Sequence, residues 1–287
     1  LNWFEMKLFS GKLKCMHSSA KSLDGRLNVR LEVLPGDSVH QRVGLAAEAG
    51  FDGIAFPGRF RERFGPETLE ALVDLPLPVR SVSLGFSGSL CSPIEEERQL
   101  CRDSLLRLFE FTSALGATCV NMPPALIQDN TDRFPPGREQ EQDQLLIDQL
   151  PELGDEAEKF GLVLLIEPVN GFETDYLTTV GHAARICRQV DHPAVGLTPD
   201  FFHMQMEELD VAGALGAAAE WVRLLHVAEN TRVEPGPGQM DFRPGFRALK
   251  EAGYEGMVEV ECRKLSGPAR EVLPRSVEYL RREWENA

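Results

Sequence analysis

The sequence predicts a (β/α)8 barrel, and three observations lead to that prediction. Short apolar segments alternate with longer amphipathic ones, four glycines stand between a helix and a strand, and no Pro/Gly/Ser-rich tract divides the chain. Parallel strands that are buried on both faces read as nearly continuous apolar runs. Eight strand-then-helix units in one chain are typical of a closed barrel surrounded by helices.

The expected strands are five to seven residues long. They lie at Leu13–Ser18, Gly53–Pro57, Val79–Gly85, Cys119–Pro123, Leu162–Glu167, Val195–Asp200, Leu224–Ala228 and Met257–Glu261. The expected helices lie at Ser38–Ala49, Ser92–Leu115, Glu139–Phe160, Thr178–Val190, Asp210–Glu220, Pro244–Ala252 and Gly267–Trp284. The helix-ending glycines are Gly50, Gly116, Gly161 and Gly253.

An open doubly wound sheet is the alternative fold. It would carry a glycine-rich GxGxxG turn after its first strand, and no such turn follows Leu13–Ser18. The longest irregular segments, Pro123–Pro136 and Asn230–Pro244, both follow strands, where a barrel builds its active site. We therefore expect one barrel domain over residues 1–287, with residues 1–10 as a short N-terminal extension.

The composition of the chain excludes several classes of function. The chain has 287 residues, with 30 Lys and Arg against 45 Asp and Glu, and a formal net charge of −15, which disfavours nucleic acid as a partner. No apolar run approaches the roughly 20 residues that a membrane helix needs. The six cysteines form no CxxC pair and indicate buried thiols in a reducing cytoplasm. The sequence thus predicts a cytoplasmic protein without membrane or nucleic-acid partners.

The last four expected strands each carry a metal-competent side chain at or near the carboxyl end: Glu167, Asp200, His226 and Glu261. Burying a lone carboxylate costs several kcal/mol unless it is paired or ligated. Taken singly, each carboxylate could form a local salt bridge and the histidine could be a core residue. Four in a row predict a divalent metal site, and three oxygens with one imidazole suit Mn²⁺, Mg²⁺, Co²⁺ or Zn²⁺.

Motifs around these residues resemble those of a known family. They are Glu-Pro-Val-Asn-Gly-Phe-Glu at 167–173, Asp-Phe-Phe-His-Met at 200–204, His-Val-Ala-Glu-Asn-Thr-Arg at 226–232, the Pro-Gly-rich segment 235–242, and Gly-Tyr-Glu-Gly at 253–256 ahead of Glu261. From about residue 160 to 262 the chain resembles the xylose-isomerase-like sugar isomerases and epimerases, in particular the D-tagatose and D-psicose (allulose) 3-epimerases. Before residue 160 the barrel periodicity alone supports the resemblance.

The resemblance implies a role for each matching residue. Glu167, Asp200, His226 and Glu261 would hold one divalent ion, with Mn²⁺ favoured, and Glu167 and Glu261 would be the acid/base pair on opposite faces of the substrate. Glu173, His203 and Arg232 would hold the carbonyl end of the sugar and its neighbouring hydroxyls. For these three the plain alternatives are a helix-start residue, a packing histidine and a surface ion-pair partner. The resemblance also implies a homodimer or homotetramer, and no residue pattern identifies an interface.

Epimerisation beside a ketone fits these residue types. A proton leaves one face of the carbon and another returns to the opposite face, through an enediolate whose negative charge a metal stabilises. Glu234 and Asp241 in the loop after the seventh strand would repel a phosphate, so we expect an unphosphorylated ketose. Three departures, Gly171, Glu229 and Gln239 where relatives have Arg, Asp and His, leave the ligands intact and put the identity of the sugar in doubt.

Other functions compete with this one. The same carboxylates could serve a lyase or dehydratase of a keto-sugar or keto-polyol, of the inosose dehydratase or 3-keto-glycoside type. A three-zinc apurinic endonuclease is disfavoured by only six histidines and the negative charge. A non-catalytic scaffold predicts a broken ligand set, whereas the set is complete. His17 could face the pocket, and we expect the basic segment 56–63 to be a solvated loop rather than a substrate contact.

Overall fold

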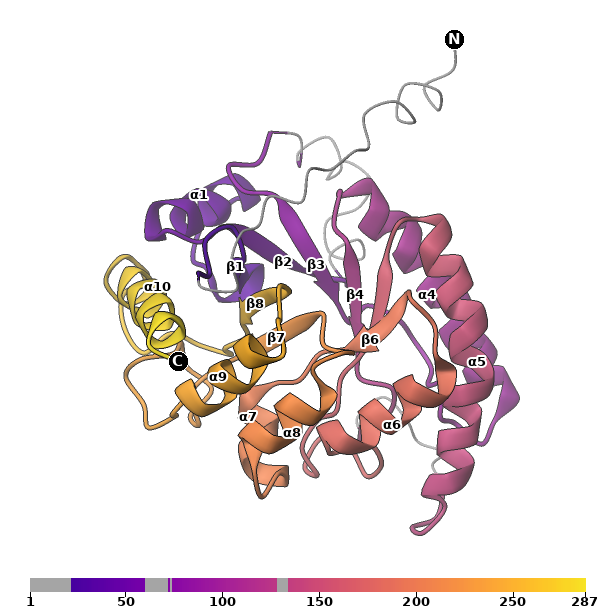
Figure 1. Ribbon diagram of the computed structural model, residues 1–287. Helices are drawn as coiled ribbons and strands as arrows, with labels where there is room; N and C mark the ends of the chain where they lie inside the picture. Colours follow the sequence, from indigo (N-terminus) through magenta and orange to yellow (C-terminus); the bar gives the residue numbers. More distant parts are fainter. Residues whose placement is uncertain (1–21, 60–71, 73, 128–133) are drawn as a thin grey trace.

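Eight parallel strands form the centre of the molecule, and helices surround them (Figure 1). The computed structural model describes residues 22–59, 72, 74–127 and 134–287. The strands are β1 Leu27–Arg30, β2 Gly53–Pro57, β3 Val79–Ser83, β4 Cys119–Met122, β5 Val163–Ile166, β6 Val195–Leu197, β7 Leu224–Val227 and β8 Met257–Val260. Their order is β6-β5-β4-β3-β2-β1-β8-β7. Isolated parallel bridges from Leu197 to Val222 and from Asp200 to His226 join the two edges, so the predicted barrel is confirmed.

The helices of the described residues follow the amphipathic segments closely. They are α1 Val39–Ala49, α4 Glu95–Ala114, α5 Glu139–Lys159, α6 Val180–Val190, α7 Phe201–Glu207, α8 Val211–Ala218, α9 Arg243–Glu251 and α10 Ala269–Glu285, with a short 3-10 helix at Leu31–Val33. Side chains cap several of them, as Ser38 does by accepting from Gln41 N at the start of α1. Helix α7, whose N-cap is Asp200, was not predicted from the sequence.

The position of the first strand was predicted wrongly. The first barrel strand is Leu27–Arg30, which pairs with β2 on one side and β8 on the other. The segment expected there, Leu13–Ser18, lies outside the described residues, as do His17, residues 1–10 and residues 60–63 of the basic segment. Leu27–Arg30 is only four residues long and ends in a charge, so its apolar signal is weaker than that of the segment chosen.

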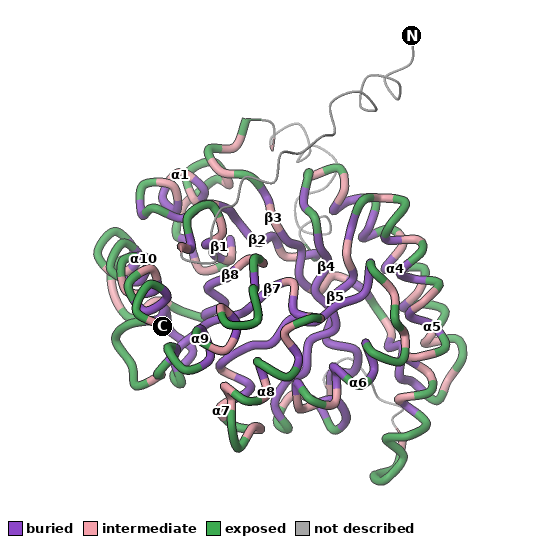
Figure 2. The backbone as a smooth tube through the Cα atoms, in the orientation of Figure 1, coloured by how far each residue is buried: buried purple, intermediate pink, exposed green. Residues whose placement is uncertain are grey.

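Apolar side chains fill the space between the strands and the outer helices, whereas the inward faces of the strands also carry buried polar side chains, among them Asn28, Ser81 and Asn121. Figure 2 shows the strands buried along most of their length. Between strands and outer helices, aromatic rings from three helices and a loop pack together. Phe201 and Phe242 lie 5.0 Å apart between ring centroids, and Phe246 lies 5.1 Å from Trp284. Trp284 lies in α10, and α10 also contacts α1. This packing therefore joins the C-terminal helix to the first helix of the described chain.

Replacing Phe246 with alanine should lower the free energy of unfolding by about 3–5 kcal/mol. The ring is completely buried and is in contact with three other aromatic rings, so its removal leaves a cavity. Urea denaturation followed by circular dichroism would measure the change. Phe172→Ala is the matched control, because that ring is 86% exposed and its loss should cost no more than about 0.5 kcal/mol. Equal losses in the two variants would contradict this account of the core.

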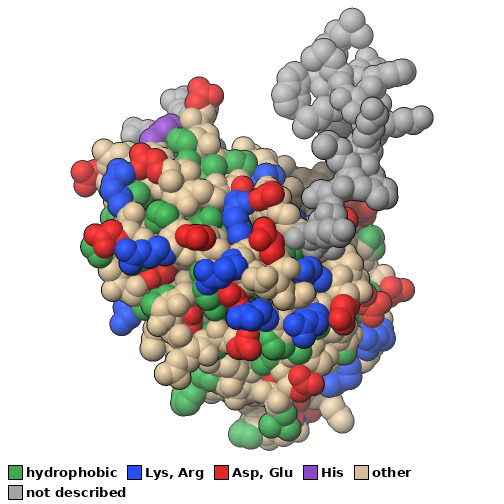
Figure 3. Space-filling view, turned by 60° about the vertical axis from the view of Figure 1, so that its left-hand side comes forward, with side chains coloured by type: hydrophobic (Ala, Val, Ile, Leu, Met, Phe, Trp, Pro, Cys, Tyr) green, Lys and Arg blue, Asp and Glu red, His purple; other side chains and the backbone are tan. Residues whose placement is uncertain are grey.

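Charged side chains of both signs are interspersed on the surface face drawn in Figure 3.

Five cysteines are buried free thiols: Cys91, Cys101, Cys119, Cys187 and Cys262. Among the described residues, no helix combines the length and the apolar character needed to cross a membrane.

Candidate active site

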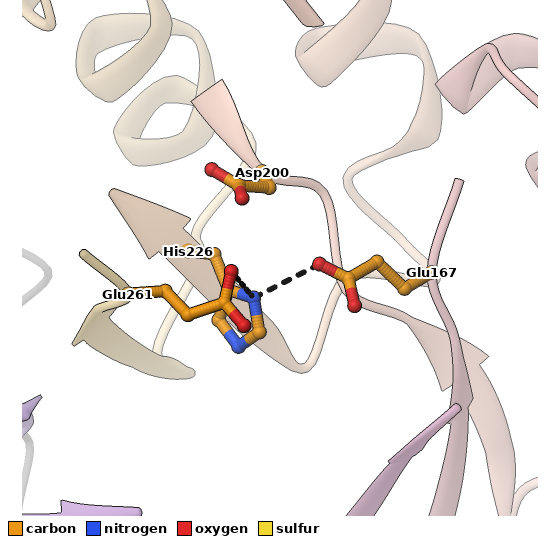
Figure 4. Close-up of side chains that lie close together, drawn as sticks. All are labelled: Glu167, Asp200, His226 and Glu261. Carbon is orange, nitrogen blue, oxygen red and sulfur yellow. Dashed lines mark hydrogen bonds and ion pairs between the residues drawn. The ribbon is translucent and has the colours of Figure 1, made fainter. Parts of the chain in front are cut away.

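Four side chains from neighbouring strands meet at one end of the barrel (Figure 4). Glu167 and Glu261 directly follow β5 and β8, His226 lies in β7, and Asp200 is bridged to His226 from the end of β6. One potential ligand atom from each lies within 4.8 Å of those from the other three, and all four residues are buried. Parallel strands present their carboxyl ends at one rim, which is why the linear spacing predicted this convergence.

One oxygen of each carboxylate accepts a hydrogen bond that orients the group. The hydrogen bonds run from Asn121 Nδ2 to Glu167 Oε2 at 2.7 Å, from Phe202 N to Asp200 Oδ1 at 2.9 Å, and from Arg30 Nη1 to Glu261 Oε1 at 2.8 Å. The second oxygens of Glu167 and Glu261 lie 3.0 and 3.5 Å from His226 Nδ1. In Figure 4 these two glutamates approach the imidazole from opposite sides. The arrangement thus turns one oxygen of each glutamate toward a common centre.

Opposite charges in this cluster stabilise the ionised forms of one another. Burial alone would lower the pKa of His226, but the negative charges of Glu261 and Glu167 raise it well above its ordinary value. Burial alone would raise the pKa of Glu261, whereas Arg232, His226 and Arg30 hold that pKa well below its ordinary value. The cluster therefore favours an ionised Glu261 with positive charge close to it.

Arg232 links two of the four residues. Its Nη1 and Nη2 donate to Asp200 Oδ2 and Glu261 Oε2, and its guanidinium lies 4.2 Å from the centre of the Phe202 ring. The residue has a left-handed backbone with φ +59°, which is uncommon for a side chain of this size. Backbone strain of this kind is retained where the surrounding structure enforces it.

The loop that carries Arg232 is organised by Glu229. This buried carboxylate accepts hydrogen bonds from Gly236 N at 2.8 Å and from Met240 N at 3.1 Å, and Glu229 O accepts from Arg232 N. Gly238 must be glycine here, because a Cβ would lie 2.1 Å from the Glu229 carboxylate. Glu229, a departure from the resembled motif, therefore fixes the backbone of this loop through hydrogen bonds.

A cavity of about 450 Å³ opens above the cluster. Five of the predicted site residues line it: Glu167, Glu173, His203, Arg232 and Glu261. Asp200 and His226 are completely buried and lie outside that lining. The cavity wall is partly apolar, with Leu84, Pro123, Leu126 and Val169 among its residues.

His203 and Glu173 are fixed by the Asn170 turn. Asn170 N donates to His203 Nδ1 at 3.1 Å, while His203 Nε2 lies 3.6 Å from Asp200 Oδ2. Glu173 Oε1 accepts from Asn170 Nδ2 at 3.2 Å and pairs with the exposed Arg263 at 3.0 Å. All seven predicted residues are therefore brought to one region.

Three neighbours of the site were not predicted from the sequence. Arg30, which bonds Glu261, was missed because β1 was misplaced; the alternating pattern of Leu27–Arg30 after the Asp24-Gly25 turn was the available signal. Asn121 lies in the correctly predicted fourth strand, but nothing in the linear pattern pairs it with Glu167. Glu259 stands two residues before Glu261 and therefore points to the same side of β8.

The donor set fits a divalent cation. Metal–oxygen distances of about 2.1 Å place neighbouring donors about 3 Å apart and opposite donors about 4.2 Å apart. His226 Nδ1 already lies at such separations from Glu167 and Glu261, and the 4.8 Å limit for the whole set calls for a small contraction. Three buried carboxylates around one imidazole could bind a hard to borderline metal ion.

Comparison with known proteins agrees with this geometry. The family model described as "Xylose isomerase-like TIM barrel" matches residues 43–283. The chain belongs to the xylose isomerase-like TIM barrel family. This membership confirms the resemblance inferred from the motifs and extends it to residues before 160.

Relatives in the family are named epimerases and isomerases. The chain is 29% identical over 231 residues to the 3-dehydro-D-guloside 4-epimerase of Escherichia coli K12, covering 79% of this chain and 88% of that protein. It is 27% identical over 229 residues to the ketose 3-epimerase of Arthrobacter globiformis, covering 78% of each. The crystal structure of an E. coli 3-keto-D-glucoside 4-epimerase superposes with a TM-score of 0.79 at 26% identity, covering 90% of this chain and 99% of that one. These relatives support an enzyme of the sugar isomerase and epimerase type.

Proposed function

We propose that the protein is a metal-dependent epimerase of an unphosphorylated ketose or keto-sugar, and that it inverts the carbon beside the carbonyl. The observation that carries the proposal is the pair Glu167 and Glu261, whose inner oxygens approach His226 Nδ1 from opposite sides at the floor of one cavity. A carbon held between two such carboxylates can lose a proton to one and gain a proton from the other.

The residues have distinct roles in this proposal. Glu167, Asp200, His226 and Glu261 would hold the ion, with Mn²⁺ favoured, and a bound divalent cation supplies Lewis-acid stabilisation of the negative charge that develops in the enediolate. Glu167 takes or returns the proton on one face, and Glu261 does so on the other. The two exchange tasks when the reaction runs in reverse.

Neighbouring groups keep both carboxylates ready for that exchange. Asn121 fixes the orientation of Glu167, and Arg30 and Arg232 keep Glu261 ionised. Arg232, His203 and Glu173 line the same cavity and are polar, so we assign to them the carbonyl end of the substrate and its adjacent hydroxyls. Fixed donors aimed at developing charge are worth several kcal/mol in such sites.

Nuclear magnetic resonance in D₂O tests the proposal. The Mn²⁺-treated protein is incubated with a panel of ketoses and 3-keto-glycosides, the metal is then removed by chelation, and the products are analysed. We expect one deuterium at the inverted carbon, beside the carbonyl, of one or more compounds. An enone or a released aglycone would replace the epimerase proposal with a lyase, and absence of exchange from every compound would reject proton abstraction for that panel.

Replacing Arg232 with lysine should lower kcat/KM by roughly 10- to 150-fold, the equivalent of about 1.5–3 kcal/mol. A lysine ammonium cannot bridge Asp200 and Glu261 as the two guanidinium nitrogens do. Initial rates on the accepted substrate would measure the change. Arg243→Lys is the control, because Arg243 pairs with Glu283 between α9 and α10 and does not line the cavity. A loss below threefold would contradict the bridging role.

A further inference from the structure

A second glutamate of β8 lies beneath the site. Glu259 and Glu261 alternate with valines, so both side chains point into the barrel, with Glu259 one layer deeper. Glu259 is completely buried, and in the strand register it stands directly opposite His226. Glu259 does not line the cavity in which the proposed reaction takes place.

The contacts of Glu259 are divided between its two oxygens. Oε2 accepts a hydrogen bond from Ser81 Oγ at 2.5 Å, which fixes the carboxylate plane. Oε1 lies 3.4 Å from His226 Nε2, and within the described part of the chain neither of these two buried atoms has a hydrogen-bond partner. Because it is unfavourable to leave a buried donor and a buried acceptor unpaired, a small approach between the two atoms is strongly favoured.

The two nitrogens of His226 therefore face two different groups of carboxylates. Nδ1 faces the site, at 3.0 Å from Glu167 and 3.5 Å from Glu261, whereas Nε2 faces Glu259. An imidazole that ligates a metal through one nitrogen carries its proton on the other, and the partner of that proton sets the tautomer and the ring orientation.

We propose that Glu259 is a positioning residue that accepts the Nε2–H of His226 and so directs the Nδ1 lone pair toward Glu167, Asp200 and Glu261. The inference rests on the proposed use of His226 as a metal ligand. Glu259 is not itself a fifth ligand, because it lies on the far side of the imidazole and Ser81 holds its other oxygen. It acts on the site through His226.

Two variants of Glu259 test this role. Glu259→Leu removes the acceptor at similar volume, and Glu259→Gln retains a neutral acceptor. Calorimetric titration should show Mn²⁺ binding weakened about 10- to 100-fold in Glu259→Leu, with Glu259→Gln between that variant and the wild type. The matched control is Glu283→Gln, a buried glutamate in α10 that pairs with Arg243 and should leave Mn²⁺ affinity unchanged.

A second readout follows the imidazole directly. Long-range ¹H–¹⁵N spectra of the Mg²⁺-loaded protein report which ring nitrogen is protonated, and the His226 signals are identified by their loss in His226→Asn. We expect an Nε2–H tautomer with a slowly exchanging proton in the wild type, and faster exchange of that proton in Glu259→Leu. Unfolding curves of metal-free protein establish that each variant is folded, and Glu259→Gln supplies the result if Glu259→Leu is not.

The possible outcomes separate this inference from the proposed function. Equal Mn²⁺ affinity in the wild type and both Glu259 variants would overturn the positioning role while leaving the metal site in place. Ligation of the metal through His226 Nε2 would also overturn the positioning role of Glu259. Absence of divalent-metal binding by the wild type would overturn the metal site and the positioning role with it.

Discussion

Glu261→Gln is expected to lower kcat/KM by about 10²–10⁴-fold, which is the usual contribution of one general acid or base. Through its two oxygens Glu261 contacts the guanidiniums of Arg30 and Arg232 and the His226 ring. Glutamine preserves the size of the side chain but can neither accept the proton nor balance that charge. Initial-rate kinetics at saturating Mn²⁺ would measure the loss, because saturation separates proton transfer from a weaker affinity for the ion.

The same variant distinguishes acid–base catalysis from metal ligation alone. If Glu167 and Glu261 serve opposite faces, Glu261→Gln should still exchange the proton of the epimer whose hydrogen faces Glu167, in D₂O and without inversion. The other epimer should not exchange. Glu167→Gln should show the reverse preference. Loss of exchange from both epimers in both metal-saturated variants would mean that the two glutamates act only as ligands. Glu283→Gln, far from the cavity, controls for the loss of a buried carboxylate.

The four-residue cluster could be predicted because each member belongs to a strong local pattern. Glu167 and Glu261 end apolar runs that are too short for a core helix, and parallel strands place all such ends on one rim. Periodicity therefore predicted the helices of the described residues other than α7, and seven of the eight strands, near their observed positions. His226 was found for the same reason, within the run Leu224–Val227.

Partners that lie far from the site residues along the sequence could not be predicted in this way. Arg30 is 231 residues from Glu261 along the chain, and Asn121 is 46 from Glu167. Such pairs depend on the register between strands and on the loop closing above them, and neither has a signature in a single sequence. The misplaced β1 shows a related limit, because a four-residue strand contributes few side chains to any periodic signal. The strand-end pattern pointed to the four candidate ligands but not to the groups that hold them.

Removal of the divalent ion is expected to abolish turnover, with recovery on addition of Mn²⁺. Without a cation, the inner oxygens of Glu167, Asp200 and Glu261 share a buried region with only an imidazole and the Arg232 guanidinium between them. Rates should fall at least 100-fold after treatment with a chelator and gel filtration. Titration of Mn²⁺, Mg²⁺, Co²⁺ and Zn²⁺ into the treated protein would identify the ion that restores the rate most fully.

Stability should follow the same titration. An ion that binds the folded chain stabilises it by RT ln(1 + [M]/Kd), about 2.7 kcal/mol at 100 times Kd, so the unfolding midpoint should rise with Mn²⁺ concentration. Phe246→Ala should keep this rise, because Phe246 offers no ligand atom and does not line the site cavity, whereas His226→Asn should lose most of it. Full activity after complete chelation would contradict metal dependence. Arg30 and Arg232 would then be the groups that stabilise the developing negative charge. Because both guanidiniums bind Glu261, a double Arg30→Met and Arg232→Met variant would then decide whether charge alone drives the reaction.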